Sequence, residues 1–94
     1  MTAATRKEVY DAIDSERNYQ ERRAVEAGTV PGTVRPHSVE EFVVYMDDYM
    51  RELKTQLSRT WTSDRSVPPE ALNTLRKVVT LGVAAMEQHG APKR

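Results

Sequence analysis

The residues with the clearest chemical potential are the arginines, tyrosine and glutamine of the segment SERNYQERR, residues 15–23. Guanidinium groups bind phosphate oxygens through paired hydrogen bonds, and aromatic rings stack on nucleobases. The segment therefore predicts contacts to a phosphate-bearing ligand from Arg17, Tyr19, Gln20, Arg22 and Arg23. Side chains one or two positions apart diverge on a helix, so only part of this set can face one ligand.

Other residues extend the predicted site. Arg35 and His37 precede a predicted helix whose N-terminus itself attracts anions, so they are expected to close the pocket. Tyr45 and Asp48, on that helix, offer a hydroxyl and a carboxylate that suit ribose hydroxyls. A structural interpretation stays open beside this one, in which Arg17 and the other polar groups of the first segment pair with acids of the second helix.

Three acids and one tyrosine follow one another on the same helix at intervals of four, three and four residues: Glu41, Tyr45, Asp48 and Glu52. Carboxylates one turn apart suit magnesium, although an octahedral site usually needs further oxygen ligands. Glu41, Asp48 and Glu52 are therefore candidate metal ligands. The alternative is a solvated flank in which Glu41 caps its own helix and Asp47 pairs with Arg51.

Three helices are expected to position these residues. Thr5 with Glu8, and Ser38 with Glu41, have capping-box spacing, and proline and glycine mark further ends. The resulting helices cover about residues 6–26, 39–60 and 69–89 of a single domain, joined by turns at 27–38 and 61–68. The chain is thus expected to be all-α.

The apolar patterns differ among these helices. On the first, Val9, Tyr10 and Ile13 start a core-facing stripe that Arg17 and Gln20 interrupt. On the third, residues 78–86 contain one polar side chain, Thr80, so the helix must be covered on more than one side. We therefore expect a homo-oligomer with the third helix near the shared core and Gly82 permitting close helix approach.

Composition narrows the partners. The 94 residues contain 14 basic and 14 acidic side chains, and a net charge of zero argues against nucleic acid or membrane as partner. The absence of cysteine excludes disulfides, thiolate metal sites and cysteine nucleophiles. No apolar run resembles a signal peptide or a membrane span, so we expect a soluble protein of the cytoplasm.

The order of segments resembles that of small phage-encoded proteins related to MazG-like nucleotide pyrophosphohydrolases. The resemblance covers most of the chain and rests on ERNYQERR, a Pro/Gly turn, HSVEEF, an acidic helix and a final apolar helix ending MEQHGAPKR. It implies a MazG-like helical bundle and, in active members, E-x-x-E and E-x-x-D acids that hold magnesium against a nucleoside triphosphate. Only Glu41 or Glu40 matches the first motif, and Val44 or Val43 stands where its partner is expected.

The second motif is absent, because no acid lies between Glu70 and Glu87, and Arg76 and Lys77 occupy that region. The resemblance therefore implies binding without hydrolysis and without a cofactor. By analogy with phage proteins that sequester the nucleotide signals of bacterial defence systems, we expect a cyclic nucleotide or an ADP-ribose derivative as ligand in the host cytoplasm. A magnesium-dependent pyrophosphohydrolase and a structural or protein-interaction module remain alternatives.

Overall fold

A computed structural model describes residues 3–26, 37–58 and 67–94 of the chain. These ranges contain three helices and no strand: α1 (Arg6–Glu26), α2 (Val39–Ser58) and α3 (Pro69–His89). The all-α expectation is confirmed for this part of the chain. The expected helix end at residue 60 and the predicted pocket residue Arg35 lie outside the described residues.

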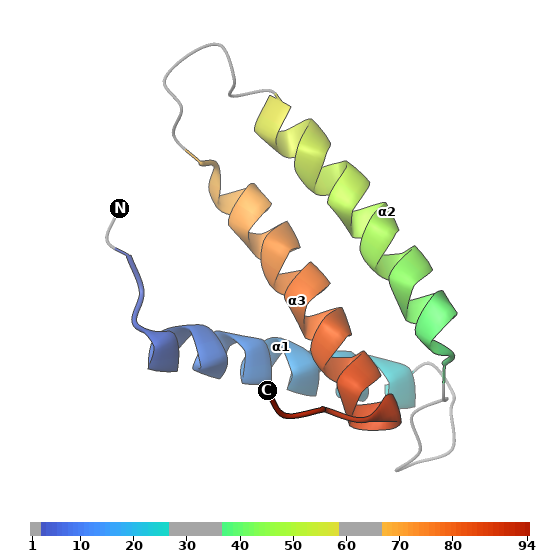
Figure 1. Ribbon diagram of the computed structural model, residues 1–94. Coiled ribbons are helices and arrows are strands. Elements are labelled where there is room, and N and C mark those ends of the chain that lie inside the picture. The colour runs from blue at the N-terminus through green and yellow to red at the C-terminus, as the bar shows by residue number, and fades with distance from the viewer. Residues whose placement is uncertain (1–2, 27–36, 59–66) are drawn as a thin grey trace.

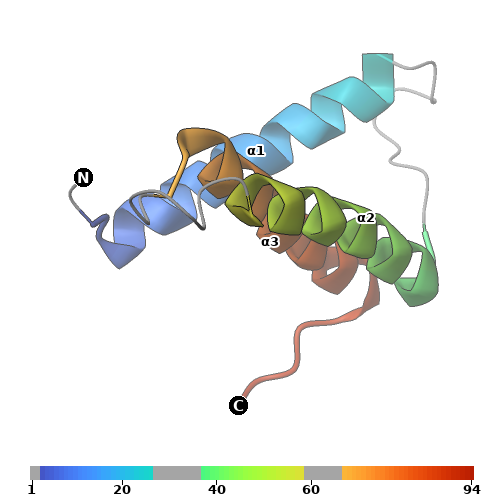
Figure 2. The same ribbon diagram turned by 90° about the horizontal axis from the view of Figure 1, so that it is seen from above.

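The three helices are arranged around α3. Helices α2 and α3 run antiparallel and side by side, while α1 crosses the C-terminal half of α3 (Figure 1). Figure 2 shows that α1 runs obliquely to the other two helices. Within the described residues α3 packs against both neighbours, whereas α1 and α2 do not pack against each other. None of the described helices is long and apolar enough to cross a membrane.

Local capping determines where the helices begin and end. The Glu8 amide donates to Thr5 Oγ1 at 3.2 Å, and the Glu41 amide donates to Ser38 Oγ at 3.1 Å. In return, the Ser38 amide donates to Glu41 Oε1 at 3.0 Å, which completes the capping box. Helix α3 starts with Pro69, and Gly90 ends it with φ of 119° while its amide donates to Met86 O at 2.8 Å.

The core lies between α2 and α3. Phe42 and Leu53 of α2 are buried against α3, together with five buried α3 residues: Ala71, Thr74, Val78, Thr80 and Ala84. The threonine hydroxyls are satisfied by the preceding turn, since Thr74 donates to Glu70 O at 3.0 Å and Thr80 to Arg76 O at 2.7 Å. Among the described residues only these seven are buried, which is a small core for a chain of this length.

Helix α1 departs from the expected stripe. Val9 and Tyr10 are exposed, and α1 has no buried residue among those described. The side chains that lie against α3 are instead polar, because only 9% of the Glu16 side chain and 11% of the Arg17 side chain are exposed. The expectation that Val9 and Tyr10 face the core is therefore wrong, since α3 presents Arg76 and Glu87 to this helix.

Gly82 lies at the α2–α3 contact. A Cβ atom added there would lie 3.7 Å from Met46 Cε, which is an ordinary van der Waals separation. The approach of α2 to α3 therefore does not require a glycine. Close approach of a further helix at Gly82 remains a prediction.

Candidate functional site

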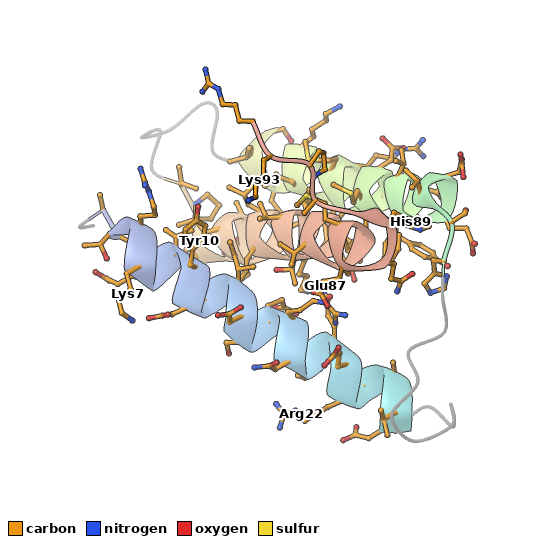
Figure 3. The ribbon with its side chains drawn as sticks, turned by 60° about the horizontal axis from the view of Figure 1, so that its bottom comes forward. Lys7, Tyr10, Arg22, Glu87, His89 and Lys93 are labelled. Atoms are coloured by element: carbon orange, nitrogen blue, oxygen red, sulfur yellow. The ribbon has the colours of Figure 1, made fainter. Side chains whose placement is uncertain are left out.

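Arg17 is the residue on which the two interpretations of the first helix differ most. Its Nε donates to Glu87 Oε2 at 2.8 Å, and its Nη2 donates to Glu87 Oε1 at 3.2 Å and to Glu21 Oε1 at 3.3 Å. Figure 3 shows Glu87 on α3 extending toward α1. The expected pairing with acids of the second helix is wrong, because the partners of Arg17 belong to α3 and to α1 itself.

A groove between all three helices brings together four of the predicted site residues: Arg17, Gln20, His37 and Tyr45. Its volume is about 260 Å³, and apolar side chains such as Phe42 and Leu81 form much of its wall. Ligand pockets usually occupy about 300 to 1,000 Å³, so the groove is small for a nucleotide. The Arg17 guanidinium is also neutralised by two carboxylates, which weakens it as a phosphate ligand.

His37 joins the start of α2 to the end of α3. Its amide donates to Gln88 Oε1 at 3.0 Å, and His89 Nε2 lies 2.7 Å from the His37 carbonyl oxygen. A carbonyl oxygen only accepts, so His89 Nε2 carries the proton in this contact. The His37 ring packs edge to face on Phe42 and Tyr45, each at a centroid separation of 5.5 Å. These contacts give His37 a structural role at this end of the hairpin.

The acidic flank of α2 is engaged in local contacts. The Ser38 amide and the nearby His37 ring, 3.3 Å from Glu41 Oε2, lower the pKa of the Glu41 carboxyl below its ordinary value of 4.5. Glu52 Oε1 accepts from Gln56 at 3.4 Å, and Arg51 pairs with Asp47 at 3.0 Å. No three acids or histidines of the described residues are grouped as metal ligands.

A larger cleft lies between α1 and α3. Its volume is about 510 Å³. Two α3 cations line it, Arg76 and Lys77, together with five α1 residues: Ala12, Ser15, Glu16, Tyr19 and Arg22. Tyr19 and Arg22 are thus predicted site residues that meet in one cleft. Figure 3 shows Arg22 extending from α1 on the side away from α3, which places it at the outer rim.

Three cations and one acid give this cleft a positive charge. Arg76 is held in place, because its Nε donates to Glu16 Oε1 and its Nη1 donates to Asn73 Oδ1, each at 3.0 Å. Lys77 Nζ lies 5.6 Å from the centroid of the Tyr49 ring, a cation–π arrangement. Arg22 forms no ion pair with any residue that the structure describes, so its guanidinium is available to an anion.

Comparison of the chain with protein families, with curated proteins and with solved structures found no match. The candidate site therefore depends on the geometry and chemistry of its own residues.

Sequence reasoning did not include Arg76 and Lys77 in the predicted site and noted them only where the second acidic motif is absent. A signal was present, because they are the only charged residues between Glu70 and Glu87 on an otherwise apolar helix. Two predicted residues do not join either cavity. Arg23 is exposed on α1, and Asp48 is exposed on α2.

Proposed function

We propose that this protein binds a nucleotide-type ligand in the cleft between α1 and α3 and does not turn it over. The observation that carries the proposal is a cleft of about 510 Å³ in which cations from two helices accompany the exposed ring of Tyr19. Its volume is within the range of about 300 to 1,000 Å³ that is usual for small-molecule sites.

The lining suits both parts of a nucleotide. Arg76 has one carboxylate partner, Glu16, where Arg17 has two. Glu16 and Asn73 orient Arg76 before any ligand arrives, so little conformational entropy is lost when its remaining N–H groups bind a phosphate oxygen. Lys77 and Arg22 add positive charge on either side of the cleft. The Tyr19 ring offers a face on which a base can stack.

The carboxylates near the cleft favour binding over hydrolysis. Glu16 is the single acid among the described lining residues, and its carboxylate already accepts from Arg76. Magnesium-dependent phosphoryl chemistry usually employs several carboxylate ligands around the metal. The acids of the hydrolase alternative lie on α2, which does not line this cleft.

The resemblance to phage-encoded MazG-like proteins supports a biological setting for such binding. In this setting the protein sequesters a nucleotide signal of host defence, such as a cyclic nucleotide or an ADP-ribose derivative, in the cytoplasm. A stoichiometric sponge requires tight binding and no turnover, which is consistent with the paired state of Glu16.

Calorimetric titration tests the proposal with ADP-ribose, a cyclic dinucleotide and ATP as probes. At least one probe should bind, and Lys77→Gln should weaken it about tenfold because one charge-assisted hydrogen bond is lost. Tyr19→Ala should weaken the same probe, whereas Arg23→Gln, on the same helix but outside the cleft, should leave binding unchanged. The bound probe should be recovered intact by mass spectrometry.

Two results would contradict the proposed function. Binding that is unaffected by both Lys77→Gln and Tyr19→Ala would remove the cleft from consideration. Conversion of a bound probe to its monophosphate in the presence of magnesium would favour the hydrolase alternative.

A further inference from the structure

An exposed apolar face extends over one side of the α2–α3 hairpin. Six of its side chains have exposed fractions between 41% and 56%: Val39 and Val43 on α2, and Leu72, Leu75, Val79 and Met86 on α3. The α3 residues follow one another at intervals of three, four and seven, so they share one side of that helix. We call these six residues the hairpin face.

The two rows of the hairpin face are neighbours. Met46 of α2 meets Gly82 of α3, with a separation of 3.7 Å from a Cβ placed at Gly82. Helices α2 and α3 are antiparallel (Figure 1). Val43 precedes Met46 by one turn and Met86 follows Gly82 by one turn, so this direction puts Val43 and Met86 at the same level of the pair. The apolar surface is therefore continuous across both helices.

The hairpin face and the α1–α3 cleft are neighbouring surfaces of α3 with different centres. Lys77, which lines the cleft, is two residues from Val79, and at about 100° per residue the two side chains point about 160° apart. The three-helix groove lies on another side of the hairpin. Around the axis of α2, Tyr45 and Tyr49, which line the groove, lie on one side of the buried Phe42, and Val43 lies on the other side. Arg76, the other α3 residue of the cleft, lies about 60° from Val79, so it marks the border between the hairpin face and the cleft.

We propose that a second copy of this chain docks on the hairpin face around a twofold axis. A twofold interface buries the same surface patch of both copies, with residue i of one contacting residue j of the other and the reverse, so a patch of one charge sign is disfavoured and an uncharged apolar patch is tolerated. The α3 row has no charged member: Lys77 points away from Val79, and Arg76, at the border of the face, is paired with Glu16. The face is thus complementary to itself.

The surface areas also fit a second copy. The six residues together expose about 500 Å², within the range of about 300 to 600 Å² for the largest apolar patch of a monomer and more than half of the roughly 800 Å² that each partner buries in a standard interface. The small intramolecular core is consistent with completion by a partner chain.

Sedimentation velocity on the full chain tests this proposal with two matched variants. Val79→Lys places a cation of each copy in the shared face, while Val44→Lys makes the same change at an exposed α2 valine outside the face. The wild-type chain and Val44→Lys should sediment as a pair or as a multiple of that pair at micromolar concentration. Val79→Lys should raise the dissociation constant of the pair about a hundredfold.

Circular dichroism checks that Val79→Lys stays helical, and Leu75→Lys provides a second variant if it does not. A wild-type chain that is monomeric at micromolar concentration would overturn the proposal. So would an assembly that keeps its mass in both face variants, because another surface would then hold it together. A monomer that floats with phosphatidylcholine vesicles would assign the face to lipid and overturn it as well.

Discussion

The ion pair between Arg17 and Glu87 should make a measurable contribution to stability. Replacement of Arg17 by Ala removes a guanidinium whose side chain is 11% exposed, together with its contacts to two carboxylates. The Glu87 side chain is 45% exposed, so it recovers water when its partner is lost. The pair is therefore intermediate between a surface pair and a buried pair.

The magnitude follows from this intermediate burial. Exposed pairs contribute about 0.2 to 1 kcal/mol, and removal of one member of a buried pair costs about 3 to 5 kcal/mol. We expect Arg17→Ala to lower the free energy of unfolding by about 2 kcal/mol, because the buried aliphatic stem is lost along with the charge. The coupling between Arg17 and Glu87 should be about 1 kcal/mol.

Urea denaturation of the wild type, Arg17→Ala, Glu87→Gln and the double variant measures this coupling as a double-mutant cycle. All four proteins are compared at one chain concentration, because association would add to apparent stability. Arg23→Ala is the control, since Arg23 is exposed on the same helix, and it should change stability by less than about 0.5 kcal/mol. A coupling energy within about 0.3 kcal/mol of zero would refute the reasoning.

Three further predictions concern the caps and the hairpin. Ser38→Ala should cost about 1 kcal/mol in thermal unfolding, because the Glu41 amide loses its hydroxyl acceptor. The pKa of Glu41 is lowered on folding, so its carboxylate stabilises the protein above pH 4.5. The difference in unfolding free energy between wild type and Glu41→Gln should disappear as the pH falls below 4.5 and through the pKa of Glu41 in the folded protein. Leu53→Ala should cost about 2 to 3 kcal/mol in urea denaturation, since Leu53 is buried between α2 and α3, and a cost below about 1 kcal/mol would contradict this packing.

The helix starts could be predicted because their signals are local. Thr5 with Glu8, and Ser38 with Glu41, form reciprocal hydrogen bonds over three residues, and no other part of the chain is needed to make them. Pro69 and Gly90 act equally locally at the two ends of α3. On α2, Phe42 and Leu53 are eleven residues apart, about three helical turns, so helical spacing alone puts these two buried side chains on one side.

The partners of polar residues could not be predicted, because they depend on tertiary arrangement. Arg17 and Glu87 are 70 positions apart, and Arg76 and Glu16 are 60 positions apart. A helical pattern shows that Arg17 interrupts an apolar stripe, but not which helix it faces. The prediction that Val9 and Tyr10 face the core was wrong for the same reason, because the pattern does not show how α1 crosses α3. Both side chains are exposed, and α1 runs obliquely to the other helices (Figure 2).

The central position of α3 has a consequence for the order in which the helices assemble. Helices α2 and α3 are neighbours in sequence and share the apolar core, whereas α1 reaches α3 through polar contacts between residues 60 and 70 positions apart. Closing a longer loop costs more chain entropy, and salt screens the exposed parts of ionic contacts. We therefore expect helix α1 to dock last and to leave first as ionic strength rises. A ligand bound between α1 and α3 would oppose the release of α1 from α3.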